Sequence, residues 1–358
     1  METRSVPRVP ALPEGSEGLS RTRQNTSAHS CQDVHRTLWP MPGGVVGRRM
    51  SKKQSNRKRA ASLCSRATGM TYSRCLESAM NGHITPLRPV PDANSPEQRR
   101  FEARIAHTLA YTLRDRQLDS AVLGVQGVRL QGEQLTLRLH PIMARRIVAD
   151  LLPVFDVAYG GLRGVPGLRI RYRAGEWSLV DVRSSARVHL EGFDLRPGPK
   201  LPAVERGLTP VWRDVPDRLS RIERDEIVSW ETGSECRRTT DARDLLFSRI
   251  LRRPLLVNRA GTSHGWVNTY SHHDHDIVFE WCCGAEAEEL ADALRVSGIE
   301  NRIETIDFRA SFDCEPHAER IDMGDASIVL RCLNASWCRG DDWAGPAAIA
   351  RSNLRRYQ

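Results

Sequence analysis

The chain has 358 residues, of which 40% are hydrophobic and 27% are charged, enough for two domains with buried cores. No apolar run approaches the roughly 20 residues that a membrane-spanning helix needs. The first residues also lack the apolar core of a secretion signal, so we expect a soluble, cytoplasmic protein without a membrane partner.

The formal charge of +9 is concentrated in one short stretch. Residues 48–66 contain eight basic residues and no acidic one, whereas residues 1–47 contain five basic and four acidic residues. The remaining chain is therefore neutral. We call residues 48–66 the basic segment, and we expect it to determine how the protein meets charged partners.

Residues 1–49 are rich in Pro, Gly, Ser, Thr and Arg and show no periodicity, so they are predicted to be disordered. Met50 opens the sequence MSKKQSNRKRA, which is typical of a natural protein start. One hypothesis is that Met50 is the true start and residues 1–49 are a start-site extension. The intact mass of the native protein decides between Met1 and Met50.

Residues 50–82 are predicted to form a short basic helical hairpin. Apolar residues recur at helical spacing on either side of Gly69, a residue suited to end a helix, and Gly82 suits the end of the second helix. Such a hairpin is compatible with a helix-turn-helix or with an ordinary pair of antiparallel helices. The apolar positions are Ala60, Leu63, Cys64 and Ala67, then Tyr72, Cys75, Leu76, Ala79 and Met80.

One part of this hairpin resembles a known sequence element. Residues 66–80, RATGMTYSRCLESAM, resemble the TGM-x-Y-x-x-x-L element near the N-terminus of uncharacterised actinobacterial proteins, often of plasmid or phage type. In those proteins the element follows a basic helix. The resemblance carries no known activity, and it implies a DNA-associated setting. The matching residues are Thr68, Gly69, Met70, Tyr72 and Leu76.

The fold class predicted for the rest is α+β, as two units with antiparallel sheets. Residues 83–95 form a Pro-rich linker, and residues 96–193 form the first unit, whose opening helix has Ser95 as N-cap and Pro96 at its first position. Period-2 alternation on both sides of Gly132 and Glu133 predicts a β-hairpin. A further helix follows Pro141, and strands are expected at 168–173, 176–183 and 186–191.

Residues 194–240 are predicted to be a second linker with one short helix at 216–228. Residues 241–335 form the second unit, which begins with a helix and has another helix ending at Gly298. Residues 336–358 are expected to be an irregular tail. No repeat of 20–50 residues is evident. Strands are expected near 255–258, 265–270, 276–283, 301–308 and 326–333.

The basic segment suits contact with a nucleic-acid backbone, because clustered Lys and Arg displace counterions condensed on phosphates. It equally suits a solvated tail, and an acidic protein or a membrane surface are further alternatives. The candidate nucleic-acid-binding residues are Arg48, Arg49, Lys52, Lys53, Arg57, Lys58, Arg59 and Arg66.

The densest group of metal-ligating residue types runs from His272 to Asp276. In an extended chain His273 and His275 share one face, and His264 from a neighbouring strand would complete a set for zinc or another divalent metal. The alternative is a polar loop with solvated histidines.

No catalytic residue is predicted. No serine or cysteine is paired with a histidine in a recognised pattern, and Lys200 is the only lysine beyond the basic segment, which argues against a P-loop. The leading hypothesis is thus a non-enzymatic protein without a cofactor, whose basic N-terminal element contacts nucleic acid or an acidic protein. The alternatives are a metal-binding protein or metalloenzyme using His264, His273 and His275, and a protein-interaction scaffold.

Overall fold

The chain divides into two units, Met1–Arg49 and Met50–Gln358, and every residue that the structure describes belongs to the second. Predictions made for residues 1–49 and 336–358 therefore lie outside the described residues. The structure is a computed structural model, and it describes residues 52–112, 121–132, 134–158, 160–193, 207–213, 215–232, 240–260, 267–272, 276–281, 285–299, 303–307 and 317–332.

Two antiparallel helices, α1 (Lys52–Thr68) and α2 (Tyr72–Met80), form the predicted hairpin, which we call the head. Gly69 joins them with φ +79°, a backbone conformation that glycine adopts without strain. Thr71 precedes α2 in extended conformation, and its side chain makes no capping hydrogen bond. The helices enclose a small core of their own, made of Ala60, Ala61, Cys64, Cys75, Ala79 and Ile84.

The first large sheet has five strands in the order β1-β2-β7-β6-β5. Its pairings are antiparallel except for β2 and β7, which run parallel. Before the sheet comes α3 (Pro96–Thr112), where the Ser95 hydroxyl accepts a 3.1 Å hydrogen bond from the Gln98 N–H, confirming the predicted N-cap. The other elements are β1 (Val125–Gln131), β2 (Gln134–Leu139), α4 (Ala144–Leu151), β5 (Leu168–Arg173), β6 (Glu176–Asp181) and β7 (Arg187–Glu191).

The second large sheet also has five strands, in the order β11-β12-β13-β10-β9. Again one pairing is parallel, here between β10 and β13, and the others are antiparallel. Its elements are α6 (Thr240–Leu251), α7 (Pro254–Val257), β9 (Val267–His272), β10 (Asp276–Trp281), α8 (Ala287–Val296), β11 (Ile303–Asp307), β12 (His317–Met323) and β13 (Ala326–Cys332).

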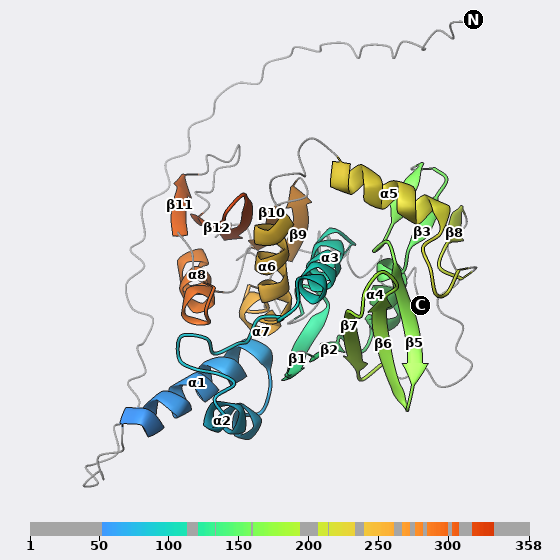
Figure 1. The fold of residues 1–358 in the computed structure, drawn as a ribbon. Coiled ribbons are helices and arrows are strands. Elements are labelled where there is room, and N and C mark those ends of the chain that lie inside the picture. The colour runs from blue at the N-terminus through green and yellow to red at the C-terminus, as the bar shows by residue number, and fades with distance from the viewer. Residues whose placement is uncertain are drawn as a thin grey trace, which may run out of the picture. The chain divides into compact units, whose positions relative to one another are not determined.

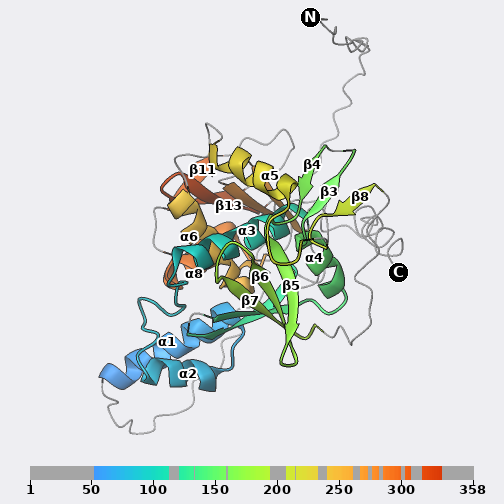
Figure 2. The ribbon, with the colours of Figure 1, turned by 45° about the vertical axis from the view of Figure 1, so that its right-hand side comes forward.

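The two sheets are built in the same way. Short inserted elements aside, in each a long helix is followed by a hairpin, a further helix and a three-stranded meander whose last strand returns parallel to the second strand of the hairpin. The two long helices, α3 and α6, lie side by side between the sheets (Figures 1 and 2). The structure thus contains a topological repeat that the sequence did not reveal.

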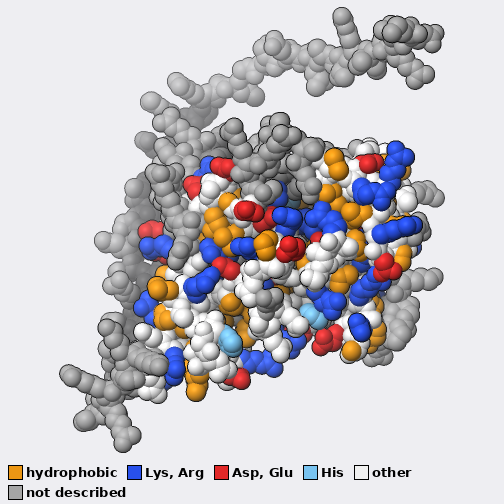
Figure 3. Space-filling model, in the orientation of Figure 1, with side chains coloured by type: hydrophobic (Ala, Val, Ile, Leu, Met, Phe, Trp, Pro, Cys, Tyr) orange, Lys and Arg blue, Asp and Glu red, His pale blue; other side chains and the backbone are white. Residues whose placement is uncertain are grey.

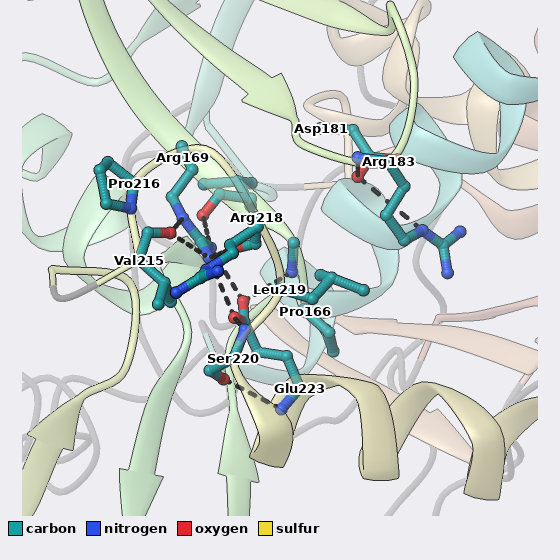
Figure 4. A network of polar contacts seen from close by, with 12 residues as sticks. Pro166, Arg169, Asp181, Arg183, Val215, Pro216, Arg218, Leu219, Ser220 and Glu223 are labelled. Carbon is teal, nitrogen blue, oxygen red and sulfur yellow. Dashed lines mark hydrogen bonds and ion pairs between the residues drawn. The ribbon is translucent and has the colours of Figure 1, made fainter.

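A small sheet of β4, β3 and β8, together with α5, lies far from the head (Figures 1 and 2). Arg169 of β5 and Glu223 of α5 point toward one another and form a buried two-armed ion pair, at 2.8 and 2.9 Å (Figure 4). Glu223 also accepts the Ser220 N–H, and the Ser220 hydroxyl accepts the Glu223 N–H, a reciprocal cap that begins α5. The bounds are β3 (Val154–Asp156), β4 (Gly161–Arg163), β8 (Leu208–Pro210) and α5 (Arg221–Thr232).

A single apolar core joins both sheets through α3 and α6. It includes residues from each half, such as Leu137 and Leu190 in the first sheet and Phe279 and Leu330 in the second. The predicted α+β class is confirmed, and the predicted domain boundaries stay predictions. None of the described helices is both long and apolar enough to cross a membrane.

The structure corrects the sequence analysis at one place in particular. Residues 255–258 do not form a strand, because Pro254 opens the short helix α7 directly after α6. Proline has a fixed φ suited to a first helical turn, and a run of four apolar residues has too few positions to distinguish helix from strand. Strand β12 was not predicted, because only part of its sequence HAERIDM alternates.

Candidate nucleic-acid interface

Helix α1 separates its apolar and basic side chains. Its seventeen residues include no Asp or Glu. Ala60 and Cys64 are buried in the core of the head and Ala67 in the main core, while Arg59 and Arg66, two turns apart on the opposite side, are exposed. The charged side chains on the solvent-facing side of α1, which we call its cationic face, are therefore all positive.

The structure brings four of the eight predicted nucleic-acid-binding side chains onto this helix. Lys58, Arg59 and Arg66 are exposed, and Arg57 is half-buried. Lys52 and Lys53 form the first turn of α1, but their side chains lie outside the described part, as do Arg48 and Arg49 altogether.

The arginines of the head differ in their partners from many arginines of the body. Within the described residues, Arg57, Arg59, Arg66 and the exposed Arg74 of α2 make no hydrogen bond or ion pair. Many body arginines are instead neutralised by carboxylates, and Figure 3 shows Lys and Arg side chains beside Asp and Glu side chains over much of one face. Such pairs are Arg100–Asp244, Arg104–Asp181, Arg169–Glu223, Arg249–Asp92, Arg252–Glu102 and Arg331–Glu280.

A cavity of about 540 Å³ lies between the head, the segment that follows it and the turn of the β1–β2 hairpin. Arg74 of α2 and Arg129 of β1 line it, together with Glu77, His83 and Asp92. Arg129 is half-buried, and its Nε is shielded from solvent without an acceptor among the described residues. Sequence reasoning missed both arginines, because 54 intervening residues separate them and neither lies in the basic segment.

Three arginines at the end of α6 hold the segment that leads from the head into the body. Arg249 makes a two-armed ion pair with Asp92 at 2.8 and 2.9 Å, and Arg252 and Arg253 donate to the carbonyl oxygens of Pro91 and Val90. Burial opposes ionisation of Asp92, but the hydrogen bond and charge of Arg249 outweigh it and lower the pKa of that carboxyl. The head is therefore held to the body by charged contacts as well as by packing.

The close approach of α1 to the first sheet depends on Gly127 of β1. A Cβ placed there would lie 3.2 Å from the Thr68 carbonyl oxygen and 2.7 Å from a terminal guanidinium nitrogen of Arg138. Only glycine leaves this space free. The end of α1 thus sits directly on β1, and this contact fixes the direction in which the cationic face points.

The predicted metal ligands His264, His273 and His275 lie outside the described residues. Within the described ranges, no group of three or more His, Cys, Asp or Glu side chains is arranged to hold a metal ion. The strands beside the predicted site are present, with His272 at the end of β9 paired to Asp276 at the start of β10. The metal site stays a prediction.

No family model, curated protein or solved structure matches this chain. The resemblance of residues 66–80 to actinobacterial plasmid- and phage-type proteins therefore stays a prediction.

Proposed function

We propose that this protein binds nucleic acid through the cationic face of its head, without enzymatic activity. The observation that carries the proposal is the contrast in arginine pairing. Arg59 and Arg66 are exposed and have no partner within the described structure, whereas several arginines of the body, among them Arg104 and Arg252, have carboxylate partners. Guanidinium groups that are already neutralised contribute little to an external field, so we expect the clustered basic side chains of α1, a helix without Asp or Glu, to attract a polyanion most strongly.

The expected mode is contact with phosphates. Guanidinium groups bind phosphate oxygens with charge-assisted hydrogen bonds, and they release condensed counterions as they do so. Such contacts position a protein on a duplex or single strand without reading bases. We therefore expect binding that depends steeply on salt and little on sequence.

The test is fluorescence anisotropy with a labelled duplex DNA and a labelled single-stranded RNA of mixed sequence, titrated at several salt concentrations. The double variant Arg59→Gln/Arg66→Gln keeps good helix formers in α1 and removes two charges. We expect the slope of log K against log salt to become shallower by about 2, since each lost phosphate contact accounts for about 0.9.

The matched control is Arg145→Gln/Arg173→Gln, which removes two exposed body arginines that have no partner in the described structure. This control variant has the same net charge as the head variant. Its affinity for the labelled nucleic acids is expected to stay within about twofold of the affinity of the native protein. An equal loss of nucleic-acid affinity in both double variants would show that net charge alone drives binding and would contradict the proposal. Absence of binding by the native chain at low salt, or equal binding of polyglutamate, would also contradict it.

A further inference from the structure

Two cysteines meet inside the head. Cys64 lies one turn before the end of α1, and Cys75 lies in the first half of α2. Both are almost fully buried, with 2% and 0% of their surface exposed, and both belong to the small core of the head, where each thiol shifts the pKa of the other. We propose that Cys64 and Cys75 form an oxidisable dithiol that a peroxide converts to a disulfide linking α1 to α2.

The turn between the helices holds the two thiols together. The Thr68 hydroxyl donates to the Cys64 carbonyl oxygen at 2.7 Å and accepts the Met70 N–H at 3.1 Å, and the Ser65 hydroxyl donates to the Met70 carbonyl oxygen at 2.7 Å. These bonds fix the chain reversal that brings α2 back along α1. The turn therefore keeps both cysteines within the same small core.

The cavity described above gives Cys64 a route to solvent-borne reagents. Cys64 forms part of its wall, whereas Cys75 is not among the lining residues. A volume of about 540 Å³ is far larger than a molecule of hydrogen peroxide, since a water molecule occupies about 30 Å³ in the liquid. The geometry assigns Cys64 to the first reaction with the oxidant and Cys75, behind it, to the second.

The electrostatic surroundings favour the same division of roles. The hydrogen bond from the Cys75 thiol lowers the pKa of Cys64 against the effect of burial, and the Thr68 hydroxyl and the positive charge of Arg253 add to this. Donation to Cys64 and burial both raise the pKa of Cys75. Cys64 is therefore the better nucleophile, because the thiolate is the reactive form.

The reaction balances in two steps. The Cys64 thiolate attacks one oxygen of hydrogen peroxide, the O–O bond breaks, and after protonation the products are a sulfenic acid and one water. The Cys75 sulfur then attacks the Cys64 sulfur, and the hydroxide that leaves takes up the Cys75 proton as a second water. The two thiols lose two electrons in total, and the peroxide gains them.

The test uses the native full-length chain, which contains nine cysteines, so the readout must be site-specific. The protein is treated with a stoichiometric amount of hydrogen peroxide, free thiols are blocked with N-ethylmaleimide, and a non-reduced tryptic digest is mapped by mass spectrometry. We expect the peptide that joins Cys64 to Cys75, 2 Da lighter than the two reduced peptides together. Amide exchange in α1 and α2 should slow on oxidation and recover with a reductant.

Single variants identify the order of reaction. Cys75→Ser is expected to leave Cys64 as a sulfenic acid that dimedone traps, and Cys64→Ser is expected to give no dimedone adduct at residue 75. Cys332→Ser, which changes a buried cysteine of β13, should form the Cys64–Cys75 peptide like the native chain. If the native protein yields no such peptide, and both thiols are alkylated by maleimide after unfolding, the proposal is wrong. The inference does not depend on nucleic-acid binding, because no nucleic acid enters the test.

Discussion

At the level of single residues, buried contacts between arginines and carboxylates recur throughout the body. Glu102 of α3 and Arg252 after α6 are both fully buried, and Glu102 also accepts hydrogen bonds from Gln98 and the Ser248 hydroxyl. A buried ion pair adds little net stability, but removing one partner leaves an uncompensated charge in the core. Several buried arginines of the body are thus tied to particular carboxylates, and the fold depends on those matches.

The pair of Arg169 and Glu223 predicts how stability responds to pH. Burial would raise the pKa of Glu223, but hydrogen bonding to Arg169 and to the N–H groups of Ser220 and Gly167 lowers it below the ordinary value. A carboxyl with a lowered pKa in the folded state stabilises the protein above its unfolded pKa of about 4.3 and loses that effect as the pH falls through the folded pKa. Glu223→Gln should therefore reduce the free energy of unfolding most near pH 7.

Urea denaturation of native and Glu223→Gln protein at about pH 7 and about pH 3 measures this effect, and the difference between them should shrink at the lower pH. Asp217→Asn is the control, because Asp217 forms an exposed ion pair with Arg171. Exposed pairs contribute little, so this variant should differ from the native protein by less than about 1 kcal/mol at both pH values. A difference between Glu223→Gln and native protein that is constant with pH would contradict the prediction.

At the level of elements, the glycines that follow α1 and α2 offer a matched pair. Gly69 and Gly82 have nearly the same positive φ, +79° and +78°, but their surroundings differ. A Cβ at Gly69 would lie 3.0 Å from Cδ1 of Leu255, whereas a Cβ at Gly82 would meet nothing within 4 Å. Both substitutions by alanine carry the backbone cost of about 1 kcal/mol, and only the first also pushes the head away from α7.

We therefore expect Gly69→Ala to lower the free energy of unfolding more than Gly82→Ala, and to speed amide exchange in α1 where α1 packs on α7. Chemical denaturation and hydrogen exchange on both variants measure the two effects. Equal destabilisation by the two alanines would mean that the contact with Leu255 has no energetic consequence.

The elements that the sequence predicted well are those with strong local signals. Ser95 and Pro96 marked the start of α3, Gly69 the end of α1, and alternating leucines the β1–β2 hairpin. Long-range features were not accessible in this way. The cavity brings together Arg74 and Arg129, which are distant in the sequence. The parallel pairing of β7 with β2 joins segments about fifty residues apart. A single sequence carries no periodic signal for either contact.

At the level of the whole molecule, α3 and α6 connect the two halves. Phe247 of α6 is buried and stacks on His107 of α3, with ring centroids 6.0 Å apart, and the Thr269 hydroxyl of β9 donates to the Ala110 carbonyl oxygen of α3. The core is continuous across this contact. The body should thus unfold as one cooperative unit although it contains two sheets.

Phe247→Ala tests that cooperativity. Removing a buried phenylalanine costs about 3–5 kcal/mol, and in a single cooperative unit the loss reaches every strand. Hydrogen exchange of the slowest amides should accelerate by a similar factor in β6 of the first sheet and in β13 of the second. Acceleration confined to β13 would show that the halves unfold separately.

The repeated order of helices and strands has a consequence for how the two halves associate. Each half supplies one central helix, and α3 of the first half packs both on α6 and on β9 of the second. A chain with only one half would leave the apolar side of its central helix uncovered, and a second copy of that chain would be the natural cover. Joining the halves in one polypeptide turns this association into an intramolecular one, whose strength no longer varies with protein concentration.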